Sequence, residues 1–264
     1  MDYQYILVDV KDRIATVTIN RPEYSNAFAR ESYFEIADAM NTLGAREDVG
    51  AIVITGAGKH FSAGGDIKRF KMLVDTGAYL KAEDIEAVSA MPMSIRNCPK
   101  PVIAMINGVA TGAGLSCALA CDFRIVEPSS KMIMAFVNMG LCDDNESIYT
   151  LMRLVGPDKA ELMMMTGDAY KGEQCVKTGL ATVLAEDGKL AETTYALAAK
   201  LASKSSTAHA GQKRLIRKYF YGGMENFAKD EGIEMAAASR QPDFTEAVNA
   251  FIEKRMPAYN LPHK

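Results

Sequence analysis

The chain has 264 residues, of which 48% are hydrophobic and 24% charged, a composition ordinary for a globular protein with a sizeable core. Its formal net charge of -3 excludes the strong basic field that a nucleic-acid-binding surface needs. The five cysteines show no repeated spacing, which disfavours a disulfide framework, and no stretch approaches the ~18–20 apolar residues of a membrane helix. We therefore expect a cytoplasmic protein with neither a nucleic acid nor a membrane as partner.

Strand and helix patterns alternate along the first two thirds of the chain. Two strand-like runs, at 5–10 and 14–19, are separated by three polar residues, which predicts a hairpin. Apolar residues at helical spacing predict a helix over 28–43. Further short, buried strands are expected at 51–55, 101–106, 123–126 and 181–184, and helices at 112–121 and 146–155.

This alternation predicts an α/β domain with mostly parallel strand pairing. From residue 189 the pattern becomes purely helical, and helices are expected at 189–203, 207–219, 224–238 and 244–255. We therefore divide the chain into a core of residues 1–188, which holds the site, and a helical C-terminal region of residues 189–264.

Two glycine-rich segments follow buried strands. Residues 60–68 follow the strand at 51–55, and the adjacent Gly64 and Gly65 permit a close backbone approach that can aim a bare N–H at a ligand. Residues 107–115 follow the strand at 101–106 and open a helix, whose N-terminus offers unpaired N–H groups. Taken alone, the first segment is better explained as a plain strand-to-helix turn, and the second as a place where Gly112 and Gly114 allow close helix–sheet packing. A dinucleotide-binding motif is disfavoured because its third glycine is replaced by Cys117.

Together with other motifs in the same order, these segments resemble the crotonase, or enoyl-CoA hydratase/isomerase, superfamily. The resemblance spans nearly the whole chain and implies a crotonase-like ββα spiral core with a C-terminal helical appendage. It also implies an enzyme that acts on an acyl-CoA thioester and assembles as a homotrimer or a dimer of trimers, with the C-terminal helices making oligomer contacts and covering the site. The matching segments are 20–22, 26–27, 61–67, 100–104, 107–108, 121–124, 153–156, 166–167 and 179–181.

The family's oxyanion hole falls on the backbone N–H groups of Gly65 and Ala113. Two such donors stabilise the enolate of a thioester, so the α-proton becomes easier to remove. Coenzyme A is then part of the substrate, and neither a separate cofactor nor a metal is expected. Only three histidines occur, and they are scattered.

The family's acid and base residues match less well. The two glutamates of the hydratases fall on Ser116 and Phe136, which disfavours ordinary hydration. Asp144 aligns with the proton-carrying aspartate of dienoyl-CoA isomerases and with the nucleophile of 4-chlorobenzoyl-CoA dehalogenases, while Asp143 falls where dihydroxynaphthoyl-CoA synthases carry an aspartate. Two adjacent carboxylates near apolar surface repel, which raises a pKa toward a catalytic range. Alternatively, Asp143, Asp144 and Asn145 cap the following helix.

Three side chains are expected in the substrate pocket, namely Ser116, Phe136 and Met93. Phe136 lies where the dehalogenases place a tryptophan, although it fits a core position equally well. Met93 replaces their assisting histidine, which weighs against dehalogenation. Contacts to coenzyme A are expected from Ala63, Asp66, Ile67, Lys68 and Arg21; the alternative for Lys68 is a solvated helix face.

The resemblance leaves four functions open. The first is an isomerase that shifts a double bond with Asp144 as proton carrier, since one carboxylate suffices for that. The second is a hydratase with a rearranged carboxylate set that includes Asp143 or Glu146. The third is an acyl-CoA hydrolase or dehalogenase with Asp144 as nucleophile, and the fourth is a non-catalytic binder of CoA esters.

Overall fold

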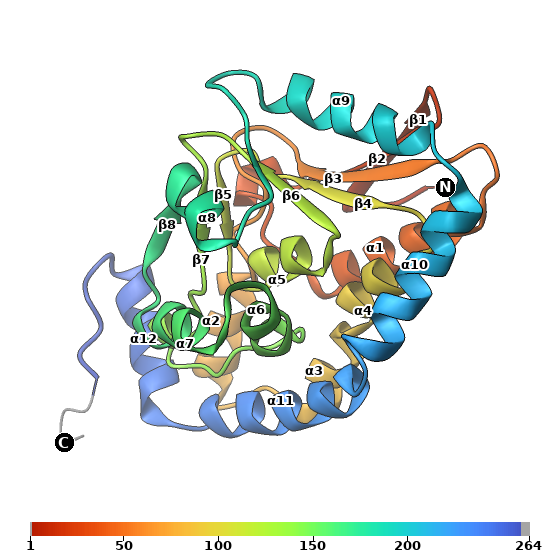
Figure 1. The fold of residues 1–264 in the computed structure, drawn as a ribbon. Helices are drawn as coiled ribbons and strands as arrows, with labels where there is room; N and C mark the ends of the chain where they lie inside the picture. Colours follow the sequence, from red (N-terminus) through yellow and green to blue (C-terminus); the bar gives the residue numbers. More distant parts are fainter. Residues whose placement is uncertain (1, 260–264) are drawn as a thin grey trace.

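A six-stranded sheet lies at the centre of the computed structural model, which describes residues 2–259 (Figure 1). Its strand order is β1-β2-β3-β4-β6-β9; β1 and β2 form an antiparallel hairpin and the other neighbours pair in parallel. The hairpin and the four later strands that the sequence predicts are confirmed. The bounds are β1 (Ile6–Lys11), β2 (Ile14–Ile19), β3 (Ala51–Gly56), β4 (Val102–Met105), β6 (Phe123–Val126) and β9 (Val183–Leu184).

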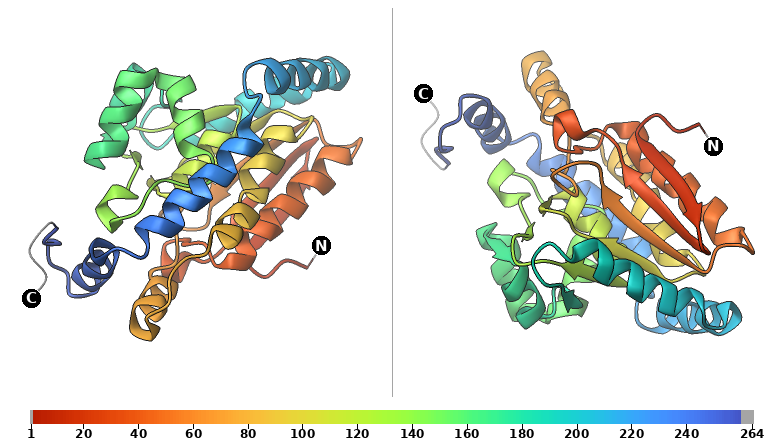
Figure 2. Two further views of the ribbon diagram at one scale, coloured as in Figure 1. Left: turned by 90° about the horizontal axis from the view of Figure 1, so that it is seen from below. Right: turned by 90° about the horizontal axis from the view of Figure 1, so that it is seen from above.

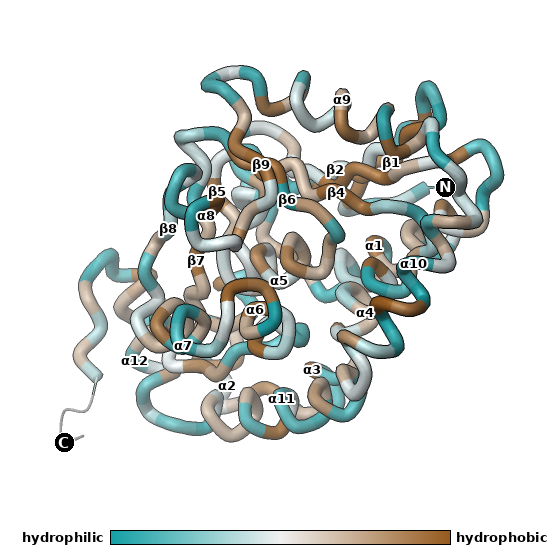
Figure 3. Tube along the Cα trace, in the orientation of Figure 1, coloured by the Kyte–Doolittle hydropathy of each residue, from teal (hydrophilic) through white to brown (hydrophobic). Residues whose placement is uncertain are grey.

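The central strands are buried on both faces, as their continuous apolar runs require. Alternate residues of β3 point to opposite sides, so Ile52 and Ile54 belong to one apolar cluster and Ala51 and Val53 to another. The first cluster includes residues of α1 (Arg30–Ala45), α4 (Ala90–Asn97) and α5 (Ala113–Ala120), and the second is covered by α9 (Leu190–Ala202). Figure 2 shows α9 lying across the sheet, and Figure 3 shows hydrophobic residues concentrated along the central strands.

A second, three-stranded sheet was not predicted. It consists of β5 (Val109–Thr111), β7 (Lys131–Ile133) and β8 (Ala169–Lys171), with β5 parallel and β8 antiparallel to β7. Three residues per strand are too few for a period-2 pattern to emerge from the sequence. This sheet carries the chain from β5 directly into α5, and so sets the position of the second glycine-rich segment.

The other helices surround these sheets. Their bounds are η1 (Pro22–Tyr24), α2 (Ile67–Thr76), α3 (Ala82–Val88), η2 (Val137–Met139), α6 (Ser147–Val155), α7 (Pro157–Thr166), α8 (Gly172–Thr178), α10 (Ser206–Tyr219), α11 (Met224–Ala238) and α12 (Pro242–Ile252).

The helical C-terminal region is confirmed as a run of four helices, and it is packed onto the core at several places. In addition to α9 on the sheet, α11 lies against α3, and α12 lies against α2 and η2 (Figure 1). Helix α10 has no buried residue. Within residues 2–259, no helix is both long enough and apolar enough to cross a bilayer.

Candidate active site

The two glycine-rich segments lie against each other. Ser62 and Ala110 form a parallel bridge between them. Gly64, at φ 84°, packs so closely that a Cβ there would lie 2.7 Å from the carbonyl oxygen of Thr111 and 3.4 Å from the nitrogen of Ala113. Segments that are about 48 residues apart in the sequence are therefore in direct backbone contact.

Two backbone amides in these segments are free to donate. Gly65 and Ala113 line the same cavity, and neither N–H donates a hydrogen bond to any residue in the part of the chain that the structure describes. Gly112, with φ 51° and ψ -129°, adopts a conformation accessible essentially only to glycine and turns the chain so that α5 begins at Ala113. The first N–H groups of a helix have no partner within it and carry partial positive charge, which favours a developing negative charge.

Gly114 allows this close approach. A Cβ on Gly114 would lie 2.6 Å from the Cβ of Ser62 and 2.7 Å from its carbonyl oxygen. We expect Gly114→Ala to push the two segments apart, lowering the free energy of unfolding by about 1–3 kcal/mol and reducing turnover together with it. Thermal denaturation and steady-state kinetics measure both effects. Gly211→Ala on α10, whose Cβ would meet only the Arg214 side chain at 3.9 Å, serves as the control and should leave both unchanged or raise stability.

The cavity has a volume of about 400 Å³ and mostly apolar walls. Its size and lining are typical of a site for a small organic group. The lining residues come from the three-stranded sheet, from α1, α2 and α5, from the C-terminal helices and from the segments between these elements. They are Tyr33, Ala63, Gly65, Ile67, Phe70, Thr111, Gly112, Ala113, Ile133, Ala135, Phe136, Asn138, Met139, Leu141, Asp144, Gly167, Ala169, Met235, Ala247, Phe251, Arg255 and Pro257.

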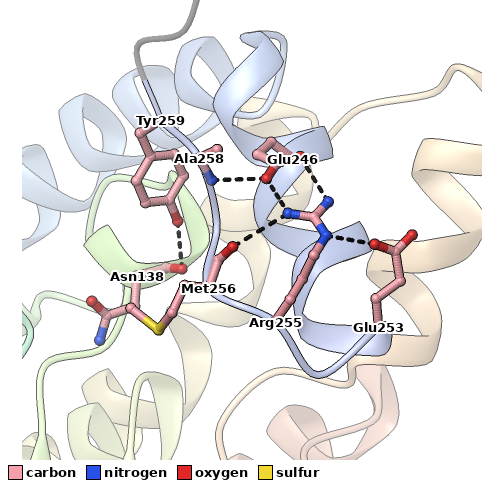
Figure 4. A network of polar contacts seen from close by, with 7 residues as sticks. All are labelled: Asn138, Glu246, Glu253, Arg255, Met256, Ala258 and Tyr259. Carbon is pink, nitrogen blue, oxygen red and sulfur yellow. Dashed lines mark hydrogen bonds and ion pairs between the residues drawn. The ribbon is translucent and has the colours of Figure 1, made fainter.

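The segment after α12 forms part of the cavity wall and is fastened by polar contacts (Figure 4). The Arg255 guanidinium donates to both carboxylate oxygens of Glu246 and to Glu253. The Tyr259 hydroxyl donates to the carbonyl oxygen of Asn138 at 2.6 Å. The end of the helical C-terminal region therefore covers the cavity of its own chain.

Asp144 is the only carboxyl group among the described residues that line the cavity. It is 5% exposed, and burial raises its pKa to about 6, against the opposing effects of a hydrogen bond from Asn145 and of the positive charge of Arg69. A carboxyl group with such a pKa is ionised in most molecules at neutral pH and still accepts a proton readily. Asp144 is therefore suited to general acid–base chemistry.

Tyr33 is a polar group of the cavity that the sequence analysis missed. It lies on the buried face of α1, and burial together with the charge of Asp144 raises the pKa of its phenol far above the usual range. The hydroxyl is consequently neutral at any working pH and is available as a donor. A tyrosine on an otherwise apolar helix face was the only signal in the sequence.

The charge of Arg69 gives a prediction about pH dependence. Because Arg69 lowers the pKa of Asp144, Arg69→Gln should raise that pKa and shift the acid limb of a plot of kcat against pH to higher pH. Arg30→Gln removes a cation that pairs with Asp84 on the surface, and it should leave the limb in place. An acid limb that stays put or moves down in Arg69→Gln would refute this electrostatic link.

Among the side chains expected in the pocket, only Phe136 lines the cavity. Ser116 lies beneath it on α5, with its hydroxyl 3.2 Å from the carbonyl oxygen of Gly112 and 3.4 Å from that of Asp144. The prediction that Met93 lies in the pocket is wrong. Met93, on α4, packs instead in a separate cluster with Tyr149, Phe227, Tyr221 and Met224.

Asp143 is placed next to the cavity but does not line it. It is buried, and its pKa is raised to about 7 by burial and by the charge of Asp144. The alternative role as a helix cap does not hold either. Helix α6 begins after Glu146, so Asp143, Asp144 and Asn145 precede its N-cap position, and the N-cap side chain itself makes no capping hydrogen bond.

The residues expected to contact coenzyme A divide into two groups. Ala63 and Ile67 line the cavity beside Gly65. Asp66 instead caps α2 by accepting the N–H of Lys68 at 2.9 Å, and it forms an ion pair with Arg21 at 3.0 Å. The guanidinium of Arg21 also donates to the carbonyl oxygen of Ala27. Arg21 and Asp66 thus help to hold the first glycine-rich segment in place.

A second cleft of about 400 Å³ lies outside the cavity, along α2. It shares Ile67 with the cavity and contains Lys68 and Lys71, whose charges suit phosphate groups. The ammonium of Lys68 lies 4.3 Å from the centroid of the Tyr24 ring. In residues 2–259, no three His, Cys, Asp or Glu side chains are arranged to hold a metal ion.

Comparison with known proteins agrees with this geometry. The family model described as enoyl-CoA hydratase/isomerase matches residues 9–261. A structure titled as an enoyl-CoA hydratase from Mycobacterium avium subsp. paratuberculosis superposes with a TM-score of 0.88 at 26% identity, covering 98% of this chain and all of the other. The chain therefore belongs to the enoyl-CoA hydratase/isomerase family of acyl-CoA enzymes, and it has the crotonase fold.

The similar curated proteins differ in their reactions. A trans-2-decenoyl-[acyl-carrier-protein] isomerase of Streptococcus mutans is 31% identical over 98% of this chain and 99% of its own length. A 1,2-epoxyphenylacetyl-CoA isomerase of Escherichia coli is 30% identical over 97% of this chain and 98% of its own. A probable enoyl-CoA hydratase of Rhodobacter capsulatus is 31% identical over 98% and 99%. These relatives establish the family, and the particular reaction has to be inferred from the residues of the site.

Proposed function

We propose that the protein is an isomerase that shifts a double bond in an acyl-CoA thioester, with Asp144 as the proton carrier. The observation that carries this proposal is the position of Asp144 as the one carboxyl group, among the described residues, that lines the cavity with the free amides of Gly65 and Ala113. A hydratase needs two groups, one to activate water and one to protonate carbon, whereas an isomerase needs a single group that takes and returns a proton.

In the proposed mechanism, the thioester oxygen accepts hydrogen bonds from Gly65 and Ala113. Ionised Asp144 removes a proton from the α-carbon of a 3-enoyl thioester, or from the γ-carbon of a 2-enoyl thioester, and the electron pair moves onto that oxygen as a dienolate. Protonated Asp144 then returns the proton to a different carbon, which restores the carbonyl and leaves the double bond displaced. Because the bound acyl group excludes water from the apolar cavity, the interactions of the Asp144 carboxylate and the two amides with the substrate are stronger than they would be in water.

Coenzyme A enters this proposal as part of the substrate, with no separate cofactor. The acyl group would occupy the cavity, while the phosphates would lie along α2 near Lys68 and Lys71. A homotrimer or dimer of trimers remains our proposal for the assembly. Helix α10 supports it, because this helix and the residue that follows it expose several large apolar side chains, namely Leu215, Ile216, Tyr219 and Phe220.

The second candidate is a hydratase, which the name of the Rhodobacter capsulatus relative favours. Turnover of 2-enoyl-CoA and 3-enoyl-CoA in water enriched in oxygen-18 separates the two reactions. The proposed isomerase interconverts the two thioesters without incorporating the label. A hydroxyacyl product that carries oxygen-18 would establish hydration instead, and no turnover of either thioester, nor of a dienoyl-CoA, would reject the isomerase.

A further inference from the structure

The turn that carries Asp144 has an unfavourable backbone conformation. The next two residues, Asn145 and Glu146, both have positive φ, at 57° and 52°. Residues other than glycine rarely adopt this conformation, and each such residue costs on the order of 1–3 kcal/mol unless its surroundings hold it. Contacts from outside the turn must therefore stabilise the conformation in which Asp144 reaches the cavity.

One such contact comes from the helical C-terminal region. Glu231 on α11 accepts the backbone N–H of Glu146 at 2.7 Å. Glu146 is the residue that precedes the first turn of α6, where the free N–H groups otherwise receive no side-chain cap. Glu231 and Glu146 are 4% and 0% exposed, so water does not compete for this hydrogen bond.

Charge favours this arrangement as well. The pKa of Glu231 is raised to about 9 and that of Glu146 to about 8, chiefly because both carboxyl groups are buried. Neighbouring acidic groups raise both pKa values further. Asp144, with a pKa of about 6, therefore ionises first, and Glu231 stays neutral beside it. A neutral carboxyl group still accepts a hydrogen bond through its carbonyl oxygen, and it adds no second negative charge near Asp144.

We propose that Glu231 is a positioning residue that, by accepting the N–H of Glu146, fixes the left-handed Asn145–Glu146 turn and so holds Asp144 in the cavity. This inference rests on the proposed role of Asp144. It also gives the helical C-terminal region a part in catalysis, because a residue 85 positions later in the chain holds the catalytic turn.

Two substitutions of Glu231 separate the hydrogen bond from the charge. Glu231→Gln keeps a neutral acceptor and should retain kcat within a factor of about two. Glu231→Leu removes the acceptor and should lower kcat by about 10- to 100-fold, as small misplacements of catalytic groups do, with little change in KM. Glu234→Gln, at an exposed position of the same helix, is the matched control and should behave as the wild type.

A double-mutant cycle distinguishes positioning from a general loss of folded protein. If Glu231 acts through Asp144, Glu231→Leu should have no further effect on kcat in the Asp144→Asn background. An equal loss in both backgrounds, or full activity in Glu231→Leu, would overturn the proposal. Should Glu231→Leu fail to fold, Glu231→Gln decides alone, because a loss of kcat in that folded variant contradicts a role that requires only an acceptor. Full activity of Asp144→Asn alone would instead reject the proposed function.

Discussion

Asp144→Asn should lower kcat for double-bond isomerisation by about 10²–10⁴-fold, the usual range for losing a general acid–base group. Asparagine has nearly the same shape and still fits the cavity, but it cannot accept a proton at neutral pH. Binding of the thioester should change little, because the cavity walls and the two amides remain. Steady-state kinetics with an enoyl-CoA, together with calorimetric titration of a saturated acyl-CoA, separate these two effects.

Asp143→Asn is the informative partner of this experiment. Asp143 is buried beside Asp144 but does not line the cavity, so its substitution should cost no more than a few-fold in kcat. If instead Asp143→Asn were inactive and Asp144→Asn active, Asp143 would be the proton carrier, and the assignment of this role to Asp144 would be wrong.

Ala113→Pro should reduce kcat by about 10²–10³-fold, as expected for the loss of one oxyanion donor. Proline has no N–H, and it is well tolerated as the first residue of a helix, which is the position of Ala113 in α5. The substitution therefore removes the donor while preserving the fold. Thermal denaturation should show a nearly unchanged midpoint, and kinetics should show the loss.

Ala113→Gly is the matched control, since it keeps the N–H and removes only a methyl group. We expect it to keep most of the activity. If Ala113→Pro stayed folded and fully active, the amide of residue 113 would have no part in catalysis, and the oxyanion hole would have to be sought elsewhere.

Local pattern was sufficient for the central sheet and for the main helices. The buried strand at Ala51–Gly56 is a continuous apolar, β-branched run that ends at a glycine-rich loop, and the helix at Met224–Ala238 is long enough for a helical pattern to be recognised. The contact between Gly64 and the Thr111–Ala113 segment, in contrast, depends on three-residue strands that carry no such pattern. That contact was expected only because of the resemblance to a family.

Within the site, the sequence pointed to Asp144, Gly65 and Ala113, which line one cavity. It misplaced Met93, because the direction in which α4 faces is set by packing against later helices. It also missed Tyr33 and Arg255, which join the cavity from α1 and from beyond α12. Contacts between residues so far apart in the chain cannot be predicted from the spacing of residues within one helix or strand.

The most direct test of the account is a crystal structure of the protein with a saturated acyl-CoA bound. We predict that the thioester oxygen lies about 2.7–3.1 Å from the nitrogens of both Gly65 and Ala113, with the Asp144 carboxylate facing the adjacent carbons. A thioester oxygen that contacts neither amide, or an acyl group that lies outside the cavity, would contradict it.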